Sequence, residues 1–372
     1  MKKWLADRLK YLKDSPPVSQ NGRLTWDVKG APLWFESPDV ELSPQAEALA
    51  CLYSAASNLA GWRINFSQPV CPVLAENLLT REQVWHSWWN AHTGHFKIKR
   101  PTFSDSQPSG HSAAFLSLGA DSFYTVLTQP EIDTVIYVCG YDIPVKDETR
   151  LAAFEPRFRE AAEQLGKRAI ILRTNLREHP VFRRLNWERF HGAALAAAAH
   201  LLQHEIDRVL ISSSFSTAYF MPWGTSWKTD PLWSSAAVGF DHYGHDLTRN
   251  LKLRKIADHP VVQQHLHICW EHRNGRLNCG LCEKCQRTML SLLSIDRLKD
   301  FPTLPSQDEL VATLRASAPL KPLLWPTYQF LIDLGLPADI SRETEALMER
   351  SRQTHPTPTP NGLGQKNLPS AH

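Results

Sequence analysis

The sequence predicts an α/β protein: an open parallel sheet with flanking helices, a smaller N-terminal α+β region and a C-terminal helical appendix. Three observations predict this fold class. From Ser112 to about Ser212, short apolar runs alternate with amphipathic segments. Before this stretch strand and helix patterns are mixed, and after residue 298 helical patterns prevail. The length of 372 residues allows two domains at roughly 150 residues each, or one large domain with appendages.

The first predicted region, residues 1–108, is α+β. Its expected elements are a strand over Arg23–Val28, a strand over Pro32–Glu36, a helix from Ser43 to Gly61 and a helix from about Thr80. The last of these helices carries Trp85, Trp88 and Trp89. Helically spaced aromatic residues bury a large area, so a core or an interdomain seam is favoured over a stacking platform for a base or sugar.

Residues 109–298 form the predicted α/β domain. Buried strands are expected at Ala113–Ser117, Thr134–Cys139, Ala169–Leu172 and Arg208–Ser212, with helices at Leu151–Leu165 and Trp187–Leu202. Right-handed crossovers between such strands place loops at the carboxyl ends of the strands, where open α/β sheets bind ligands. We therefore expect the functional site at that edge of the sheet.

The remaining chain is predicted to be a helical appendix over residues 299–351 and a disordered tail over residues 352–372. Ser306 and Glu309 have the spacing of a capping box that opens a helix. The tail contains several prolines and too little apolar surface to offset the entropy of ordering it.

Composition and charge narrow the class of protein. Hydrophobic residues make up 42% and charged residues 21%, which excludes a disordered, collagen-like or coiled-coil chain. With 41 basic and 38 acidic residues the net charge is only +3, so a nucleic-acid partner is not expected. The most apolar stretch, 193–202, is far shorter than the roughly 20 residues that cross a bilayer, and the charged N-terminus lacks a secretory signal. We expect no membrane association and a cytoplasmic location.

One motif predicts a phosphate site. A buried strand runs through Phe115-Leu116-Ser117-Leu118-Gly119-Ala120-Asp121-Ser122-Phe123 into a helix. Backbone amides at such a helix N-terminus can bind phosphate oxygens, and the helix dipole favours their negative charge. The alternative is a plain strand-to-helix turn capped by Asp121 or Ser122.

This motif resembles the Ser-Gly-Gly-x-Asp-Ser loop of the PP-loop ATP pyrophosphatases. Ser117, Gly119, Asp121 and Ser122 match the pattern, and Leu118 stands where the family usually has its first glycine. The resemblance implies a HUP-type sheet and an enzyme that cleaves ATP to AMP and pyrophosphate while it adenylates a substrate oxygen. It implies ATP binding by the run of Ser117, Leu118, Gly119, Ala120, Asp121 and Ser122.

A second motif predicts a metal site. Four of the seven cysteines, Cys269, Cys279, Cys282 and Cys285, lie close together in the sequence. Four thiolates with two Cys-x-x-Cys steps can surround zinc, and a closed four-cysteine site leaves no position for a catalytic water. We expect a structural Zn²⁺ and a reducing compartment; an unmetallated redox pair is the alternative.

The two motifs together resemble the 7-cyano-7-deazaguanine synthase family, whose zinc knuckle is similar. The knuckle and the additional N-terminal region also resemble the ATP-dependent muramoyl-tripeptide glutamate epimerases. Such adenylating enzymes need cations near the departing pyrophosphate, for which Arg249 and Lys252 are candidates. Cys139 could lie beside the adenine or carry sulfur, and Gly192 could allow close packing near the nucleotide; both residue types are more often part of the core.

We therefore expect an ATP-dependent, ligase-like enzyme that adenylates a carboxylate or carbonyl oxygen of a small molecule. Asp121 would orient the loop or Mg²⁺, and Arg249 or Lys252 would meet the developing charge. A long loop from Trp223 to the helix near Arg249 is assigned to the substrate pocket. The alternative is an elaborated surface loop whose tryptophans pack on the N-terminal subdomain. Three other functions stay open: a cell-envelope epimerase with His191 or His242 as base, a tRNA-thiolating enzyme, and a non-catalytic nucleotide-binding scaffold. The oligomeric state is not predicted.

Overall fold

A computed structural model describes residues 11–99 and 109–355 of the chain. These residues form two compact units, one within Met1–Leu266 and one within His267–His372. The predicted boundaries at residues 108, 298 and 351 stay predictions. Of the predicted disordered tail, residues 352–354 continue the last helix, and residues 356–372 lie outside the described residues.

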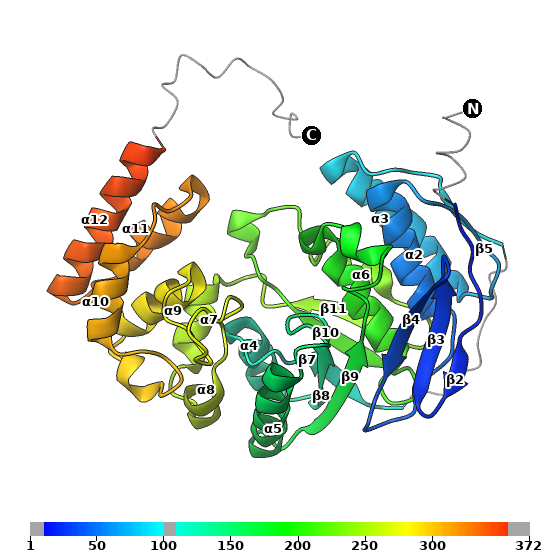
Figure 1. Ribbon diagram of the computed structural model, residues 1–372, viewed down its shortest axis with the longest axis horizontal. Coiled ribbons are helices and arrows are strands. Elements are labelled where there is room, and N and C mark those ends of the chain that lie inside the picture. Colours follow the sequence, from blue (N-terminus) through cyan, green and yellow to red (C-terminus); the bar gives the residue numbers. More distant parts are fainter. Residues whose placement is uncertain (1–10, 100–108, 356–372) are drawn as a thin grey trace, which may run out of the picture. The chain divides into compact units, whose positions relative to one another are not determined.

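An eight-stranded sheet organises the first unit, in the order β11-β10-β7-β8-β9-β4-β3-β2 (Figure 1). Its strands are β2 (Val18–Gln20), β3 (Arg23–Val28), β4 (Ala31–Glu36), β7 (Ser112–Phe115), β8 (Ile132–Cys139), β9 (Arg168–Thr174), β10 (Arg208–Ser212) and β11 (Gly239–Tyr243). Strands β7 to β11 are parallel, whereas β2, β3 and β4 are antiparallel to their neighbours. The α/β class is confirmed, but the sheet is mixed and not wholly parallel.

The antiparallel edge comes from the predicted N-terminal strands, which join this sheet. Lys29 and Gly30 connect β3 to β4 with positive φ values of 58° and 76°, the geometry of a two-residue hairpin turn. Strand β4 then pairs with β9, and the Asn175 side chain accepts the Trp34 N–H at 3.0 Å. The hairpin therefore covers the edge of β9, which would otherwise expose unpaired backbone groups.

Helices cover both faces of the parallel strands. They are α4 (Ala120–Thr128), α5 (Glu148–Gln164), α6 (Trp187–His200), α7 (Arg249–Ile256) and α8 (Pro260–His265). Helix α4 packs against α7 and α5 against α8, while the alanine-rich α6 packs against α2 (Glu47–Ala60) and shares a core with alternate sheet residues (Figure 1).

The strand order reverses direction between β7 and β10. Strands β7, β8 and β9 follow one another to one side, and β10 and β11 lie on the other side of β7. In open α/β sheets the crevice at such a reversal, outside the carboxyl ends of the strands, is where ligands bind. The loops after β7 and β10 therefore flank the expected site.

The rest of the first unit contains a small three-stranded sheet and α3 (Pro72–Trp89). The sheet consists of β1 (Tyr11–Leu12), β5 (Arg63–Phe66) and β6 (Phe96–Ile98). Helix α3 begins earlier than the expected start near Thr80, because Pro72 occupies its first position. Trp85 is buried against Trp233, with the Arg81 guanidinium over both rings, so this tryptophan belongs to the core.

The second unit is helical after the cysteine cluster. It contains α9 (Glu283–Leu293), α10 (Gln307–Ala316), α11 (Trp325–Asp333) and α12 (Ala338–Thr354). The predicted capping box is confirmed: the Ser306 side chain accepts the Glu309 N–H, and the Glu309 carboxylate accepts the Ser306 N–H. Short 3-10 helices in the two units lie at Phe182–Arg184, Thr217–Tyr219, Asp230–Trp233, Leu298–Asp300 and Pro322–Leu324. Within residues 11–99 and 109–355, no helix has the length and apolar character needed to span a membrane.

Candidate functional site

The loop after β7 ends in an uncapped helix N-terminus. The Ser122 hydroxyl accepts the Ser117 N–H at 3.2 Å and donates to the Gly119 carbonyl at 3.0 Å, so it closes the loop on itself. Gly119 is the N-cap of α4, and no side chain caps the helix there. Among the described residues, the amide N–H groups from Gly119 to Ser122 have no acceptor. Unpaired amides and the positive end of the helix dipole make this loop suited to bind an anion.

Leu118 adopts the backbone conformation that a glycine would adopt. Its φ is +60°, and its side chain is fully buried. A left-handed conformation costs an ordinary L-residue about 1–2 kcal/mol, which burial of the leucine side chain can offset. The leucine is turned into the protein interior, so the loop keeps its bend without a glycine at this position.

This conformation predicts an unusual order of stability for two substitutions. Leu118→Ala is expected to lower the free energy of unfolding by about 2–5 kcal/mol, because it removes a buried side chain. Leu118→Gly is expected to be about 1 kcal/mol more stable than Leu118→Ala, because glycine adopts positive φ without the Cβ penalty. Chemical denaturation measures both.

Leu116 is the matched control for this comparison. It is equally buried, and its φ is not positive. At Leu116 the alanine variant should therefore be more stable than the glycine variant. Finding the same order at both positions would show that Leu118 does not hold the left-handed conformation in solution.

Two cations converge on the carboxylate of Asp121, in the first turn of α4. Arg249 Nη2 lies 2.6 Å from Asp121 Oδ2, and Lys252 Nζ lies 3.2 Å from Asp121 Oδ1. Lys252 Nζ also donates to the carbonyl of Ser213, directly after β10, at 2.5 Å. The structure thus brings together Asp121, Arg249 and Lys252 at the strand-order reversal, between the ends of β7 and β10.

The charges in this cluster keep Asp121 ionised. Burial alone would raise the pKa of Asp121, but Arg249 and Lys252 together lower it below its ordinary value. Burial lowers the pKa of Lys252, an effect that Asp121 opposes. Within the cluster two cations face one carboxylate next to the unpaired amides of the loop, and the charge of Asp246 also acts on Lys252. The two cations could bind an anion.

Cys139, at the end of β8, does not have the properties of a reactive thiol. It is fully buried, and its Sγ lies 3.5 Å from a carboxylate oxygen of Glu155. Burial raises the pKa of the Cys139 thiol to about 12, so the thiolate is scarce at neutral pH. This disfavours a sulfur-carrying role. Its predicted place beside an adenine stays a prediction.

Gly192, on α6, allows a close approach of two backbone segments. A Cβ built at this position would lie 1.9 Å from the carbonyl oxygen of Gly224. Gly224 in turn donates its N–H to the Glu188 carbonyl at 2.8 Å. Close packing of the Trp223–Thr225 segment on α6 therefore explains why residue 192 is a glycine. The predicted position of Gly192 near a nucleotide stays a prediction.

Gly192→Ala is expected to lower the free energy of unfolding by about 1–3 kcal/mol, because the backbone of residue 224 must move. Gly239→Ala is the control, since its Cβ would meet only the Asp207 carbonyl, at 3.7 Å. The control should change stability by less than about 0.5 kcal/mol. Thermal or chemical unfolding of both variants measures the difference, and equal effects would contradict the packing explanation.

The predicted long loop after Trp223 is divided by regular structure. The 3-10 helix at Asp230–Trp233 and strand β11 lie within it. His242, on β11, donates from Nδ1 to Asp230 at 2.7 Å, and the side chains of both residues are almost fully buried. His191 lies within hydrogen-bond distance of the Trp187 carbonyl and the Thr225 hydroxyl. Regular structure thus divides the segment, and Trp233 packs against Trp85 of α3, as the surface-loop alternative expects. The assignment of the segment to a substrate pocket stays a prediction.

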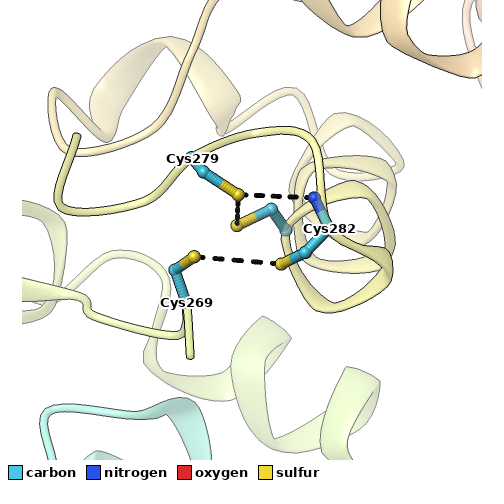
Figure 2. Close-up of side chains that lie close together, drawn as sticks. Cys269, Cys279 and Cys282 are labelled. Atoms are coloured by element: carbon cyan, nitrogen blue, oxygen red, sulfur yellow. Dashed lines mark hydrogen bonds between the residues drawn. The ribbon is translucent and has the colours of Figure 1, made fainter. Parts of the chain in front are cut away.

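The four predicted metal ligands meet in the second unit. The sulfur atoms of Cys269, Cys279, Cys282 and Cys285 lie within 4.8 Å of one another, and all four residues are buried (Figure 2). The Cys282 N–H points to the Cys279 sulfur at 3.4 Å. Hydrogen bonds from the neighbouring thiols lower the pKa of Cys269. This cluster could bind a metal ion such as zinc.

Gly280 makes the turn of this cysteine cluster possible. Its φ is +73°, and a Cβ there would lie 2.4 Å from Pro305 Cγ. Both the backbone conformation and the lack of space require glycine. Glycine at this position therefore lets the chain turn between Cys279 and Cys282.

Comparison of the chain with protein-family models, curated proteins and solved structures finds no match. Only the geometry of the two sites therefore bears on the function of the chain. Two contacts were not predicted, the hydrogen bond from Lys252 to Ser213 and the pairing of Asp230 with His242. Ser213 follows the predicted strand Arg208–Ser212, so its place at the carboxyl end of β10 could have been inferred. Asp230 begins the 3-10 helix Asp230–Trp233, within the segment assigned to the substrate pocket, and no sequence signal pairs it with His242.

Proposed function

We propose that the chain is an ATP-dependent enzyme of the PP-loop type, with a HUP-type sheet. It adenylates a carboxylate or carbonyl oxygen of a small molecule and releases pyrophosphate. The observation that carries this proposal is the placement of the loop Ser117–Ser122 and the cluster of Asp121, Arg249 and Lys252 at one strand-order reversal. A strand-to-helix loop with unpaired amides alone would support only anion binding.

Each residue of this site has its own role in the proposed reaction. The amides from Gly119 to Ser122 bind the pyrophosphate portion of ATP, and Lys252 and Arg249 neutralise the charge that develops as it departs. Both carboxylate oxygens of Asp121 already accept hydrogen bonds from these cations. We therefore assign Asp121 to orienting the two cations and not to direct coordination of Mg²⁺. Mg²⁺ would bind chiefly through phosphate oxygens and offset their charge.

A structural Zn²⁺ in the four-cysteine cluster completes the proposal. Four buried thiolates satisfy a tetrahedral zinc and leave no open position, so the metal would stabilise the second unit. All seven cysteines are free thiols. Free, metal-binding cysteines are typical of a reducing compartment, which supports the proposed cytoplasmic location.

The test is exchange of radiolabelled pyrophosphate into ATP, measured with a panel of carboxylic acids and Mg²⁺. At least one acid is expected to stimulate the exchange, because adenylation is reversible until the second step. Enzyme without acid is the background control. ATP binding with no exchange for any acid would favour the non-catalytic scaffold instead.

A further inference from the structure

We propose that His242 is the general base of the step that follows adenylation, and that Asp230 positions it. The inference rests on the proposed function, because it assigns the second reaction at the same site. The side chains of His242 and Asp230 form a pair that takes no part in the proposed phosphate binding. Asp230 has a fully buried side chain, and only 3% of the His242 side chain is exposed.

The hydrogen bonds of Asp230 fix the tautomer of His242. Asp230 Oδ2 lies 2.7 Å from His242 Nδ1, and its Oδ1 accepts the N–H of Ser226 at 3.1 Å. Because a carboxylate only accepts hydrogen bonds, Nδ1 of His242 carries the proton. The lone pair of the neutral ring is then on Nε2, which has no partner among the described residues. This is the arrangement of a base oriented by a carboxylate.

The other candidate base, His191, is disfavoured by its contacts. Its Nδ1 faces the Trp187 carbonyl, so it must donate, and its Nε2 accepts from the Thr225 hydroxyl. Burial lowers the pKa of His191, which keeps the ring neutral, but neither nitrogen is available. The contacts of the two histidines thus favour His242 over His191 as the base, a choice that the sequence leaves open.

The His242–Asp230 pair lies near the same end of the sheet as the phosphate loop. His242 is in register with Ile211 on β10, two residues before Ser213, whose carbonyl binds Lys252. His245 follows β11, with its ring 5.7 Å from that of His242, and Trp227 stacks on His245. The base thus lies at the carboxyl end of β11. Its side chain is on the face opposite α4, because the next residue, Tyr243, stacks on Tyr124 of α4 and side chains alternate along a strand.

The step that follows adenylation is an acyl or imidoyl transfer from AMP to a nucleophile. A nucleophile with an N–H or O–H group, an amine or water, forms a bond to the carbon that bears the adenylated oxygen. His242 Nε2 accepts the proton of the nucleophile, the bond from that carbon to the AMP oxygen breaks, and AMP leaves with the electron pair. Asp230 stabilises the imidazolium that forms.

One test measures directly which ring nitrogen of His242 carries the proton, and it needs no substrate. In the ¹⁵N-histidine-labelled full chain at pH 8, His242 is expected to be protonated at Nδ1 and not at Nε2. Asp230→Asn should change this tautomer distribution, whereas Asp133→Asn should not. Asp133 is the matched control, because it forms an exposed pair with His111 at the same 2.7 Å distance. A proton on His242 Nε2, or no response to Asp230→Asn, would overturn the proposal.

The second test separates the two reaction steps. With the acid that best supports exchange and hydroxylamine as the nucleophile, His242→Gln is expected to lower AMP-forming turnover by ~100-fold or more. It should lower pyrophosphate exchange far less, and His111→Gln should change neither. Equal loss of both steps, or unchanged turnover, would refute the assignment. If wild-type protein shows no exchange with any acid, the proposed function fails, and the tautomer measurement alone decides whether His242 is a poised base.

Discussion

Loss of the four-cysteine cluster is expected to unfold the His267–His372 unit. We expect purified protein to contain one zinc ion per chain, and Cys282→Ser to lose it. Apparent zinc-binding free energies in small structural sites are about 10–16 kcal/mol, which exceeds the stability that a small helical unit can supply alone. The four residues are buried against one another, so without metal their sulfur atoms would have only weak hydrogen bonds.

Elemental analysis and limited proteolysis measure this effect. Cleavage sites after residue 267 should appear in Cys282→Ser and in chelator-treated wild type, while the first unit stays resistant. Cys51→Ala is the control, because Cys51 is a buried cysteine of α2 outside the cluster. It should retain the zinc. A zinc-free protein whose second unit resists proteolysis would contradict a structural metal site.

Asp121→Asn is expected to lower acid-stimulated pyrophosphate exchange by about 100- to 1,000-fold. The asparagine has nearly the same volume but removes the charge that holds Arg249 and Lys252. The Lys252 side chain is only 1% exposed, so its ammonium would keep only neutral acceptors, the Ser213 carbonyl and the asparagine oxygen, in place of an anionic partner. Loss of an ion-pair partner at such a site also costs stability, so unfolding is measured in parallel.

Two further variants test whether the loss of pyrophosphate exchange comes from this cluster. Lys252→Met should reduce exchange by a comparable factor, because it removes a cation from the same cluster. Asp133→Asn, at an exposed pair outside the site, should leave exchange unchanged. If Asp121→Asn folds normally and exchanges pyrophosphate at the wild-type rate, the cluster has no part in ATP cleavage.

Local patterns allowed most regular elements to be predicted. The strand at Arg208–Ser212 has the predicted bounds, and the helix predicted over Leu151–Leu165 is observed at Glu148–Gln164. Strand β11 was missed because Gly239–Tyr243 contains the adjacent polar residues Asp241 and His242. It lies at the edge of the sheet, where a continuous apolar run is not required.

Long-range pairings could not be predicted from one sequence. The resemblance places Asp121 and Arg249 in one site, but they are 128 residues apart and nothing in either segment identifies them as an ion pair. The same holds for the joining of β4 to β9, which makes the sheet mixed. By contrast, the cysteine cluster was predicted correctly as a set, because spacing alone brings Cys279, Cys282 and Cys285 together.

The proposed function depends above all on binding of the pyrophosphate portion of ATP by the loop after β7. The most direct measurement is the amide spectrum of the ¹⁵N-glycine-labelled full chain during titration with magnesium pyrophosphate, with Gly119 assigned from its Gly119→Ala variant. The Gly119 amide is expected to shift as the ligand saturates. The Gly166 amide, which precedes the amino end of β9 at the opposite edge of the parallel strands, is expected not to shift. A saturable interaction that leaves the Gly119 amide unshifted would place the anion elsewhere and contradict binding by this loop.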